Sequence, residues 1–286
     1  MGRIMKCGLF DGYARLALID LTDIVNEEIK IHDLSPLATA ALGRSMLAGA
    51  YVGNNLKSDD NTYSVTINGG GPLGPIVVAG GYGKIRGYVT DNKVNLPLKQ
   101  DGHLDVGGGV GKDGYISVVK DLGLKDPYVG RSELISGEIA EDFTSYFAES
   151  EQTPSACALG VLVDTDGTVK AAGGYVIQLL PGAPDELAAA LEQSVLNVGP
   201  VTSILESNSA EELINLVLIG FEPKILEHTP VEYRCYCSRE RVRDAISGID
   251  RKELDEMAAE GKPIEVTCQF CDAVYTFDPK ELLSDI

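Results

Sequence analysis

The chain has 286 residues, 44% of them hydrophobic, with 43 acidic and 24 basic side chains and a formal net charge of −19. This length and apolar content suffice for one or two folded domains and exclude disorder as a description of the whole chain. The negative charge opposes binding to nucleic-acid phosphates, and no basic patch offsets it. The longest mainly apolar run, residues 156–163, is too short for a membrane span, and Asp11 interrupts the region where a secretory signal would be apolar. We therefore expect a cytoplasmic protein with neither a membrane nor a nucleic-acid partner.

Residues 1–180 hold 27 of the 32 glycines, and their pattern predicts a β-rich core domain. Short apolar or alternating runs between glycine clusters predict strands at residues 63–67, 75–79, 115–119 and 159–163. The sequence Asp-Thr-Asp-Gly at 164–167 predicts a tight hairpin, because glycine tolerates positive φ. The clearest helix runs from Ser35 to about Val52, with Pro36 in its first turn. A second apolar helix face is predicted from a four-residue repeat of Ile135, Ile139, Phe143 and Phe147.

Two glycine strings in this part match the dinucleotide-binding pattern Gly-x-Gly-x-x-Gly, at residues 69–74 and 109–114. That motif requires a helix N-terminus directly after the glycines, whereas each string here runs into a predicted strand. We interpret both strings as turns. No nucleophile elbow and no His-Glu-x-x-His pair appears, so the sequence does not indicate an enzyme with acid-base machinery.

The pattern becomes helical after residue 180. Apolar residues recur at three- to four-residue spacing after Pro184, and residues 209–212 (Ser-Ala-Glu-Glu) form a capping-box sequence before a second helix that Gly220 ends. We interpret residues 181–230 as a helical linker. Its apolar faces are expected to rest on the core and on the last domain through Leu187, Leu191, Leu213 and Leu216.

Four of the six cysteines lie in the last section, residues 231–286, as a Cys-x-Cys pair and a Cys-x-x-Cys pair: Cys235, Cys237, Cys268 and Cys271. Two close pairs separated by about thirty residues fit a tetrahedral thiolate site for one zinc ion in a protein of the reducing cytosol. Each pair follows a strand-like run. The section also has no tryptophan and few large aliphatic residues, so metal binding would supply much of its folding energy.

The single residue between Cys235 and Cys237 departs from the commoner zinc spacing and leaves two interpretations open. One is an inert structural zinc site. The other is a redox-responsive site, because the close spacing would let a local disulfide form once the metal leaves. Structural disulfides are disfavoured without a secretory signal.

The remaining candidate ligands are isolated in the sequence. Cys7 and Cys157 are interpreted as small buried hydrophobic residues. His228 precedes Cys235 by seven residues, but four cysteines already complete a tetrahedral shell.

Several motifs in a fixed order give the chain a resemblance to a known family. It resembles the redox-regulated heat-shock chaperonin family, the bacterial 33 kDa holdases that oxidation switches on. The resemblance covers nearly the whole chain and ends in the two cysteine pairs. Its other motifs are at residues 41–44 (Ala-Leu-Gly-Arg), 69–74, 117–123 (Ser-Val-Val-Lys-Asp-Leu-Gly), 136–142 (Ser-Gly-Glu-Ile-Ala-Glu-Asp), 150–155 (Ser-Glu-Gln-Thr-Pro-Ser) and 172–174 (Ala-Gly-Gly).

This resemblance implies an α+β protein with a β-rich N-terminal core domain, a helical linker and a small C-terminal zinc-binding redox-switch domain. It implies an ATP-independent chaperone, not an enzyme, that is inactive while the four cysteines hold one zinc ion. Oxidation would form the disulfides Cys235–Cys237 and Cys268–Cys271 and release zinc. The opened chain would then bind unfolding client proteins and form a homodimer. Cys7 and Cys157 are not part of the family's cysteine pattern.

Two other functions remain open from the cysteine pairs. A thiol-disulfide oxidoreductase could use Cys268 and Cys271, although no βαβ unit is visible around them. A zinc ribbon could bind nucleic acid, although the acidity opposes this. The acidity is also uneven, with a net charge of −7 for residues 1–180 and −12 for residues 181–286. We interpret the excess as lowering the stability of the compact linker and keeping it soluble once opened.

Overall fold

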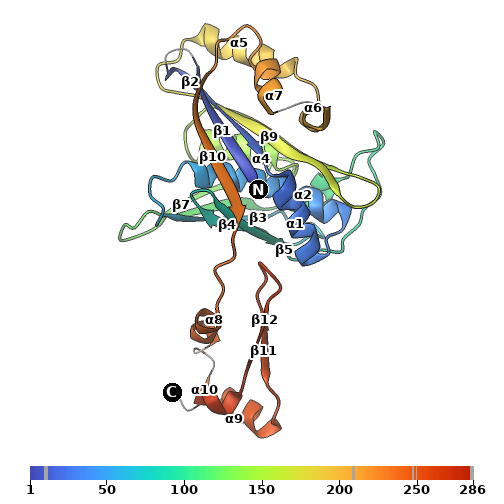
Figure 1. Ribbon diagram of the computed structural model, residues 1–286, viewed down its shortest axis with the longest axis vertical. Helices are drawn as coiled ribbons and strands as arrows, with labels where there is room; N and C mark the ends of the chain where they lie inside the picture. Colours follow the sequence, from blue (N-terminus) through green and yellow to red (C-terminus); the bar gives the residue numbers. More distant parts are fainter. Residues whose placement is uncertain (10–11, 208–209, 247, 249, 284–286) are drawn as a thin grey trace. The chain divides into compact units, whose positions relative to one another are not determined.

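The computed structural model describes residues 1–9, 12–207, 210–246, 248 and 250–283. The chain divides into two compact units, Met1–Arg234 and Cys235–Ile286. Figure 1 shows a large sheet with helices in the first unit and a small mixed unit at the C-terminal end, which confirms the α+β class. Within the described ranges, no helix combines the length and the apolar character that a membrane span requires.

Ten strands of the first unit form one sheet in the order β7-β6-β3-β4-β5-β10-β1-β2-β9-β8. Neighbouring strands are antiparallel except β10 and β5, which are parallel and pair only through Glu232 with Lys84 and Tyr233 with Ile85. The sheet therefore consists of two antiparallel halves that meet at β10. The strands are β1 (Gly2–Leu9), β2 (Ala14–Asp20), β3 (Thr62–Asn68), β4 (Ile76–Gly81), β5 (Lys84–Val89), β6 (Tyr115–Asp121), β7 (Tyr128–Glu133), β8 (Ser155–Val163), β9 (Val169–Leu179) and β10 (Lys224–Tyr233).

The four expected strands lie in β3, β4, β6 and β8, and the expected hairpin joins β8 to β9 with Gly167 at φ 86°. The glycine string at residues 69–74 is a turn, as expected, whereas the string at residues 109–114 begins in the last two residues of α3 and bends into β6. The two strings pack against each other. The Gly71 amide donates to the Val110 carbonyl at 2.9 Å. A Cβ on Gly69 would lie 2.2 Å from the Gly111 carbonyl oxygen. The glycines thus permit a close approach of two backbones.

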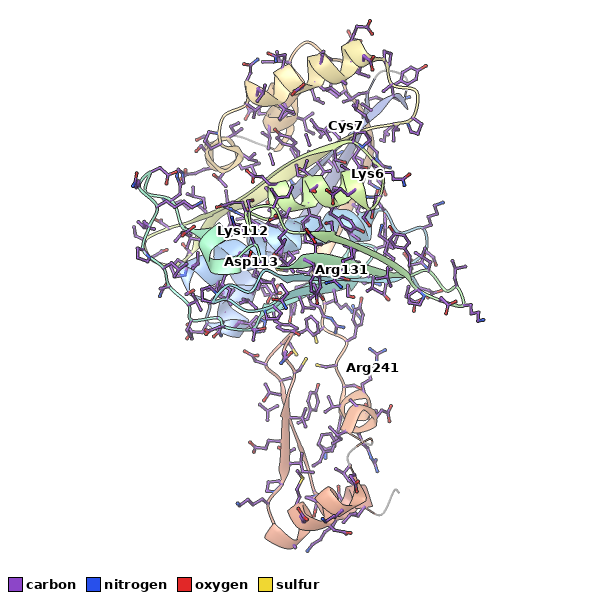
Figure 2. All side chains as sticks on the ribbon, turned by 180° about the vertical axis from the view of Figure 1, so that it is seen from behind. Lys6, Cys7, Lys112, Asp113, Arg131 and Arg241 are labelled. Atoms are coloured by element: carbon purple, nitrogen blue, oxygen red, sulfur yellow. The ribbon has the colours of Figure 1, made fainter. Side chains whose placement is uncertain are left out.

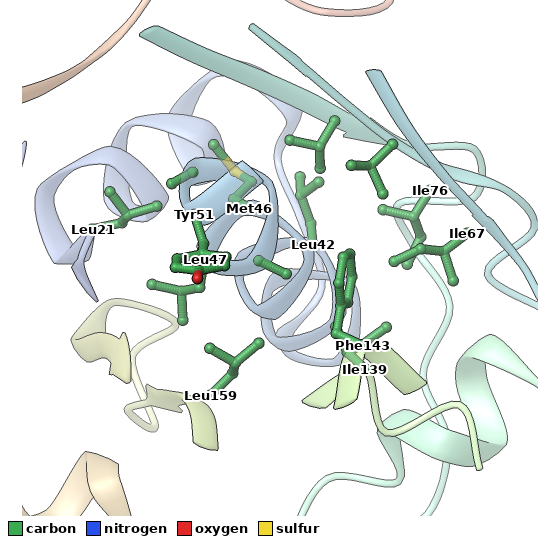
Figure 3. Close-up of a cluster of buried hydrophobic side chains, with 14 of the residues drawn as sticks. Leu21, Leu42, Met46, Leu47, Tyr51, Ile67, Ile76, Ile139, Phe143 and Leu159 are labelled. Carbon is green, nitrogen blue, oxygen red and sulfur yellow. The ribbon is translucent and has the colours of Figure 1, made fainter. Parts of the chain in front are cut away.

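Helix α2 (Pro36–Asn54) is the centre of the core. The Ser35 hydroxyl caps it by accepting a hydrogen bond from the Ala38 amide at 3.1 Å. Its side chains are buried around nearly the whole circumference, because it packs against strands from both halves of the sheet. Figure 3 shows Leu42 and Met46 of this helix among side chains from other elements, including Ile76 and Phe143. Helices α1 (Thr22–His32) and α3 (Val106–Val110) belong to the same unit.

The helix predicted from residue 135 starts later, as α4 (Ala140–Glu149), so that prediction is wrong for its first turn. Phe143 and Phe147 are buried as expected, but Ile135 is 58% exposed. The reason is Asp142, which is fully buried and accepts backbone hydrogen bonds from residues 135, 136, 137 and 139. These bonds fold the preceding segment into a tight turn, and Ile139 takes a φ of 68°.

The linker region forms three helices, α5 (Asp185–Leu196), α6 (Val201–Ser207) and α7 (Ala210–Val217). They cover one face of β1, β2 and β9 (Figure 1). Leu187, Leu191 and Leu213 are buried there as expected, whereas Leu216 is 40% exposed because α7 buries its other face. The predicted capping box begins at Ser209, outside the described residues. Side chains from this face of the sheet and from the linker region form one buried cluster, which we call the linker-facing cluster. Its members are Met5, Cys7, Leu9, Ala14, Leu16, Leu18, Tyr175, Ile177, Leu187, Leu191, Val201, Leu213, Ile214, Val217 and Leu218.

The second unit is small. It contains α8 (Arg239–Ile246), α9 (Arg251–Glu260), the antiparallel pair β11 (Ile264–Thr267) and β12 (Val274–Phe277), and α10 (Pro279–Leu283). Gly261 ends α9 in a left-handed conformation. Among the described residues of this unit, Phe277 and Leu282 are the buried members of its hydrophobic cluster. This unit therefore has little apolar burial to stabilise it.

Candidate metal centre

The four cysteines of the second unit come from two turns. Cys235 and Cys237 lie in the segment between β10 and α8, where the Ser238 hydroxyl accepts a hydrogen bond from the Arg241 amide at 3.2 Å. Cys268 and Cys271 lie in the turn between β11 and β12, closed by a hydrogen bond from the Asp272 amide to the Cys268 carbonyl at 2.8 Å. Asp272 takes a φ of 55°, which lets the chain reverse within four residues.

The structure brings the four sulfurs together. The Sγ atoms of Cys235 and Cys268 are 3.7 Å apart, and those of Cys237 and Cys271 are 3.3 Å apart. All four ligand atoms lie within 4.8 Å of one another, and all four cysteines are free thiols. Sulfurs at about 2.3 Å from a tetrahedral ion are roughly 3.8 Å apart, so this donor set can hold a metal ion.

Proximity also shifts the acidity of the thiols. Burial opposes ionisation of Cys235, but hydrogen bonds from the Cys237 amide and from the neighbouring thiols outweigh it and lower the Cys235 pKa to about 7. Burial raises the pKa values of Cys268 and Cys271. Contacts with the other three thiols raise that of Cys271 further, whereas for Cys268 the contact with Cys235 raises the pKa and the contact with Cys271 lowers it. A bound cation would favour the thiolate form of all four sulfurs.

Hydrogen-bond donors support all four sulfurs. The Cys237 amide donates to Cys235, the Phe270 and Cys271 amides donate to Cys268, and the Ala273 amide donates to Cys271. Cys237 Sγ accepts a hydrogen bond from the Tyr275 hydroxyl at 3.1 Å. This bond to Cys237 raises the pKa of Tyr275 to about 12.

Tyr275 is the residue of this centre that sequence reasoning missed. It follows Cys271 by four residues, on the strand that leaves the Cys-x-x-Cys turn. Alternation along β12 places it on the same face as buried Phe277. That pattern indicates a half-buried tyrosine near the turn, but nothing in the sequence indicates that its hydroxyl reaches Cys237.

The isolated candidates lie in the first unit. Cys7 lies on β1 (Figure 2). It is fully buried in the linker-facing cluster, as expected, and burial raises its pKa. Cys157 on β8 is half-buried and packs on the other face of the sheet, where burial raises its pKa to about 12. His228 is exposed on β10, where it pairs with Met5, and is not in the metal-ligand group.

Comparison with known proteins finds relatives that match nearly the whole chain. Residues 3–278 match the family model described as Hsp33 protein. The 33 kDa chaperonin of Clostridium tetani is 44% identical over 282 residues, covering 98% of this chain and 96% of that protein. The 33 kDa chaperonin of Alkaliphilus oremlandii is 47% identical over 270 residues, covering 94% and 90%.

A solved structure shows the same fold. The crystal structure of the 33 kDa chaperonin (heat shock protein 33 homolog) from Thermotoga maritima superposes with a TM-score of 0.92 at 36% identity. The match covers 99% of this chain and 98% of the other. Sequence, fold and the cysteine cluster lead to the same assignment, and the chain belongs to the Hsp33 family of chaperonins.

Proposed function

We propose that this chain is an ATP-independent holdase that is inactive while Cys235, Cys237, Cys268 and Cys271 hold one zinc ion and that oxidation activates. Family membership supports the chaperone function. The single observation that carries the redox part is the convergence of four free thiols within 4.8 Å in a unit with almost no hydrophobic core. A set of four thiolates favours zinc over the harder divalent ions.

In the reduced state the four thiolates tie two turns of the small unit together. When bound, zinc supplies the positive charge that keeps all four sulfurs ionised and contributes binding energy to folding. For small zinc-finger peptides that energy is roughly 10 to 16 kcal/mol, which far exceeds what the few buried apolar side chains here can contribute. The fold of residues 235–286 would thus depend on the four thiolates keeping the zinc ion bound.

Oxidation removes the ligands in two chemical steps. A thiolate attacks hydrogen peroxide, the O–O bond breaks, and a sulfenic acid and hydroxide form. The neighbouring thiol then displaces the sulfenic hydroxyl as water, which leaves a disulfide. We propose the pairs Cys235–Cys237 and Cys268–Cys271, which follow the family pattern and connect residues close in sequence. Each disulfide consumes one peroxide and two thiols, and a disulfide sulfur no longer binds the ion as a thiolate does.

Loss of the thiolate ligands would destabilise the second unit, residues 235–286, and then the linker helices α5, α6 and α7, while β10 stays part of the core sheet. The linker helices bury the linker-facing cluster on the sheet of the core domain. Their loosening would expose that apolar face of β1, β2 and β9, a surface suited to unfolding client proteins. The net charge of −12 on residues 181–286 would favour the opened state by self-repulsion and keep it soluble.

The proposed function also implies which partners the protein binds and in which compartment it acts. Clients are unfolding proteins that offer apolar segments, and the opened chains associate as a homodimer. The reduced, metal-bound state requires a reducing compartment, which is the cytoplasm.

The test is light scattering of a thermally or chemically unfolding client. The protein treated with peroxide under mild heat is expected to suppress aggregation at about one chain per client chain, without nucleotide, and reduction is expected to abolish the suppression. Equal suppression by the reduced, zinc-loaded protein would contradict regulation by oxidation.

Two further assays separate this proposal from its rivals. Catalytic turnover in a dithiol-reduction assay would indicate an oxidoreductase, whereas a holdase acts stoichiometrically. Retention of DNA or RNA that weakens with salt would indicate a nucleic-acid-binding zinc ribbon. Either result without aggregation suppression would overturn the proposal.

A further inference from the structure

The four sulfurs of the metal centre differ in the kind of donor that supports them. Backbone amides donate to Cys235, Cys268 and Cys271. A side chain donates to Cys237, through the Tyr275 hydroxyl at 3.1 Å. An amide donor is supplied by any residue except proline, whereas this hydroxyl depends on one side chain.

The fold holds Tyr275 in place for this contact. Its backbone pairs with Val266 across the β11–β12 ladder. Its ring packs against the small cluster around Phe277 and Leu282. The ring is thus fixed at its base by strand pairing and along its side by packing, and its polar end meets the sulfur. Because the ring is already restricted, forming the hydrogen bond costs little additional side-chain entropy.

We propose that Tyr275 is a positioning residue of the metal centre, whose hydroxyl holds the Cys237 thiolate and thereby sets how tightly the metal is retained and how readily oxidant opens the site. This inference rests on the proposed function, because it assigns a regulator to the same zinc switch. It concerns residue 275 alone and leaves the identity of the four ligands unchanged.

The chemical reason is the charge on sulfur. In the loaded site Cys237 is a thiolate, so a donated hydrogen bond cannot increase its ionisation further. The bond instead withdraws electron density from the sulfur and lowers its nucleophilicity toward peroxide. It also orients the sulfur, as hydrogen bonds from outside the ligand set do in other metal sites. Attack on peroxide forms an S–O bond, breaks the O–O bond and releases hydroxide, and the Tyr275 bond must weaken as the sulfur loses its charge.

The test is the variant Tyr275→Phe in the full chain, because it removes the hydroxyl and keeps the ring that packs in the cluster. We expect about a tenfold loss of zinc affinity, measured by competition with a chromophoric chelator in the absence of oxidant. Zinc release under peroxide is expected to be several-fold faster. With Co²⁺ in place of zinc, the thiolate-to-metal charge-transfer bands are expected to shift, because loss of a hydrogen bond raises the energy of the sulfur electrons.

Tyr128→Phe is the matched control, since it removes the hydroxyl of a 39% exposed tyrosine on the edge strand β7 of the other unit. Unchanged chelator competition, release rate and Co²⁺ spectrum in Tyr275→Phe would overturn the inference, even if its thermal stability fell, because packing alone does not alter those bands. A wild-type chain that binds no zinc would instead overturn the proposed function. The two failures are therefore distinguishable.

Discussion

At the scale of single residues, Asp142 shows how one buried charge shapes a motif. The residue is fully buried, and its carboxylate oxygens accept four backbone hydrogen bonds from the turn before α4. Hydrogen bonds to an ionised acceptor are roughly twice as strong as neutral ones. The Ser-Gly-Glu-Ile-Ala-Glu-Asp stretch is thus a structural turn built around its last residue.

The variant Asp142→Asn tests this role. It keeps the size of the side chain but replaces one acceptor oxygen with an amide group that cannot accept from the N–H groups facing it. We expect a loss of about 2 to 4 kcal/mol in the free energy of unfolding, measured by urea denaturation. Glu149→Gln, at an exposed position on the same helix, is the control and is expected to change it by less than about 0.5 kcal/mol. Equal effects of the two variants would contradict the account.

The four clustered cysteines and Tyr275 show how far sequence reasoning reaches at this scale. The four cysteines could be identified because each pair is local, and a short turn aims both of its sulfurs the same way. The hydrogen bond from Tyr275 to Cys237 spans 38 residues and depends on how two turns meet. The spacing of residues within each cysteine pair does not show how far apart Tyr275 and Cys237 lie in space.

At the scale of elements, the strands of the core were predictable and some of their limits were not. Alternation and glycine turns located β3, β4, β6 and β8, because those signals are local. The apolar repeat predicted a helix from Ile135, but backbone hydrogen bonds to Asp142 hold the residues before α4 in a turn. The sequence suggested a strand only from Val231, whereas β10 starts at Lys224 and lies between β1 and β5. Pairing with strands more than a hundred residues away determines that position.

The linker helices give a prediction through Cys7, which lies in the cluster that they cover. In the reduced protein Cys7 is fully buried with a raised pKa, so alkylation is expected to be slow. If oxidation loosens the linker, Cys7 meets solvent and its pKa falls toward the ordinary value. Its alkylation, measured by mass spectrometry, is then expected to accelerate at least tenfold.

Cys157 is the internal control for this measurement. It packs against the other face of the sheet, and burial raises its pKa to about 12. Its alkylation is expected to stay slow in both states. Equal acceleration at both cysteines would indicate unfolding of the whole core, and no acceleration at Cys7 would show that the linker helices stay in place.

At the scale of the whole molecule, stability and charge are unevenly distributed. Residues 1–234 form the larger unit, with an extensive hydrophobic core around α2. The unit that begins at Cys235 has a small cluster and four clustered thiols. The excess negative charge lies after residue 180. The part of the chain with the least apolar burial thus also holds the four clustered cysteines.

The most direct test of the central claim is a zinc and thiol count on one sample before and after treatment with peroxide and mild heat. We expect one zinc and six thiols per chain before treatment, with Cys235, Cys237, Cys268 and Cys271 as the ligands. Afterwards we expect no bound zinc, two remaining thiols at Cys7 and Cys157, and the appearance of aggregation suppression. Clearly less than one zinc per reduced chain, or zinc still bound after the four thiols are oxidised, would contradict the central claim.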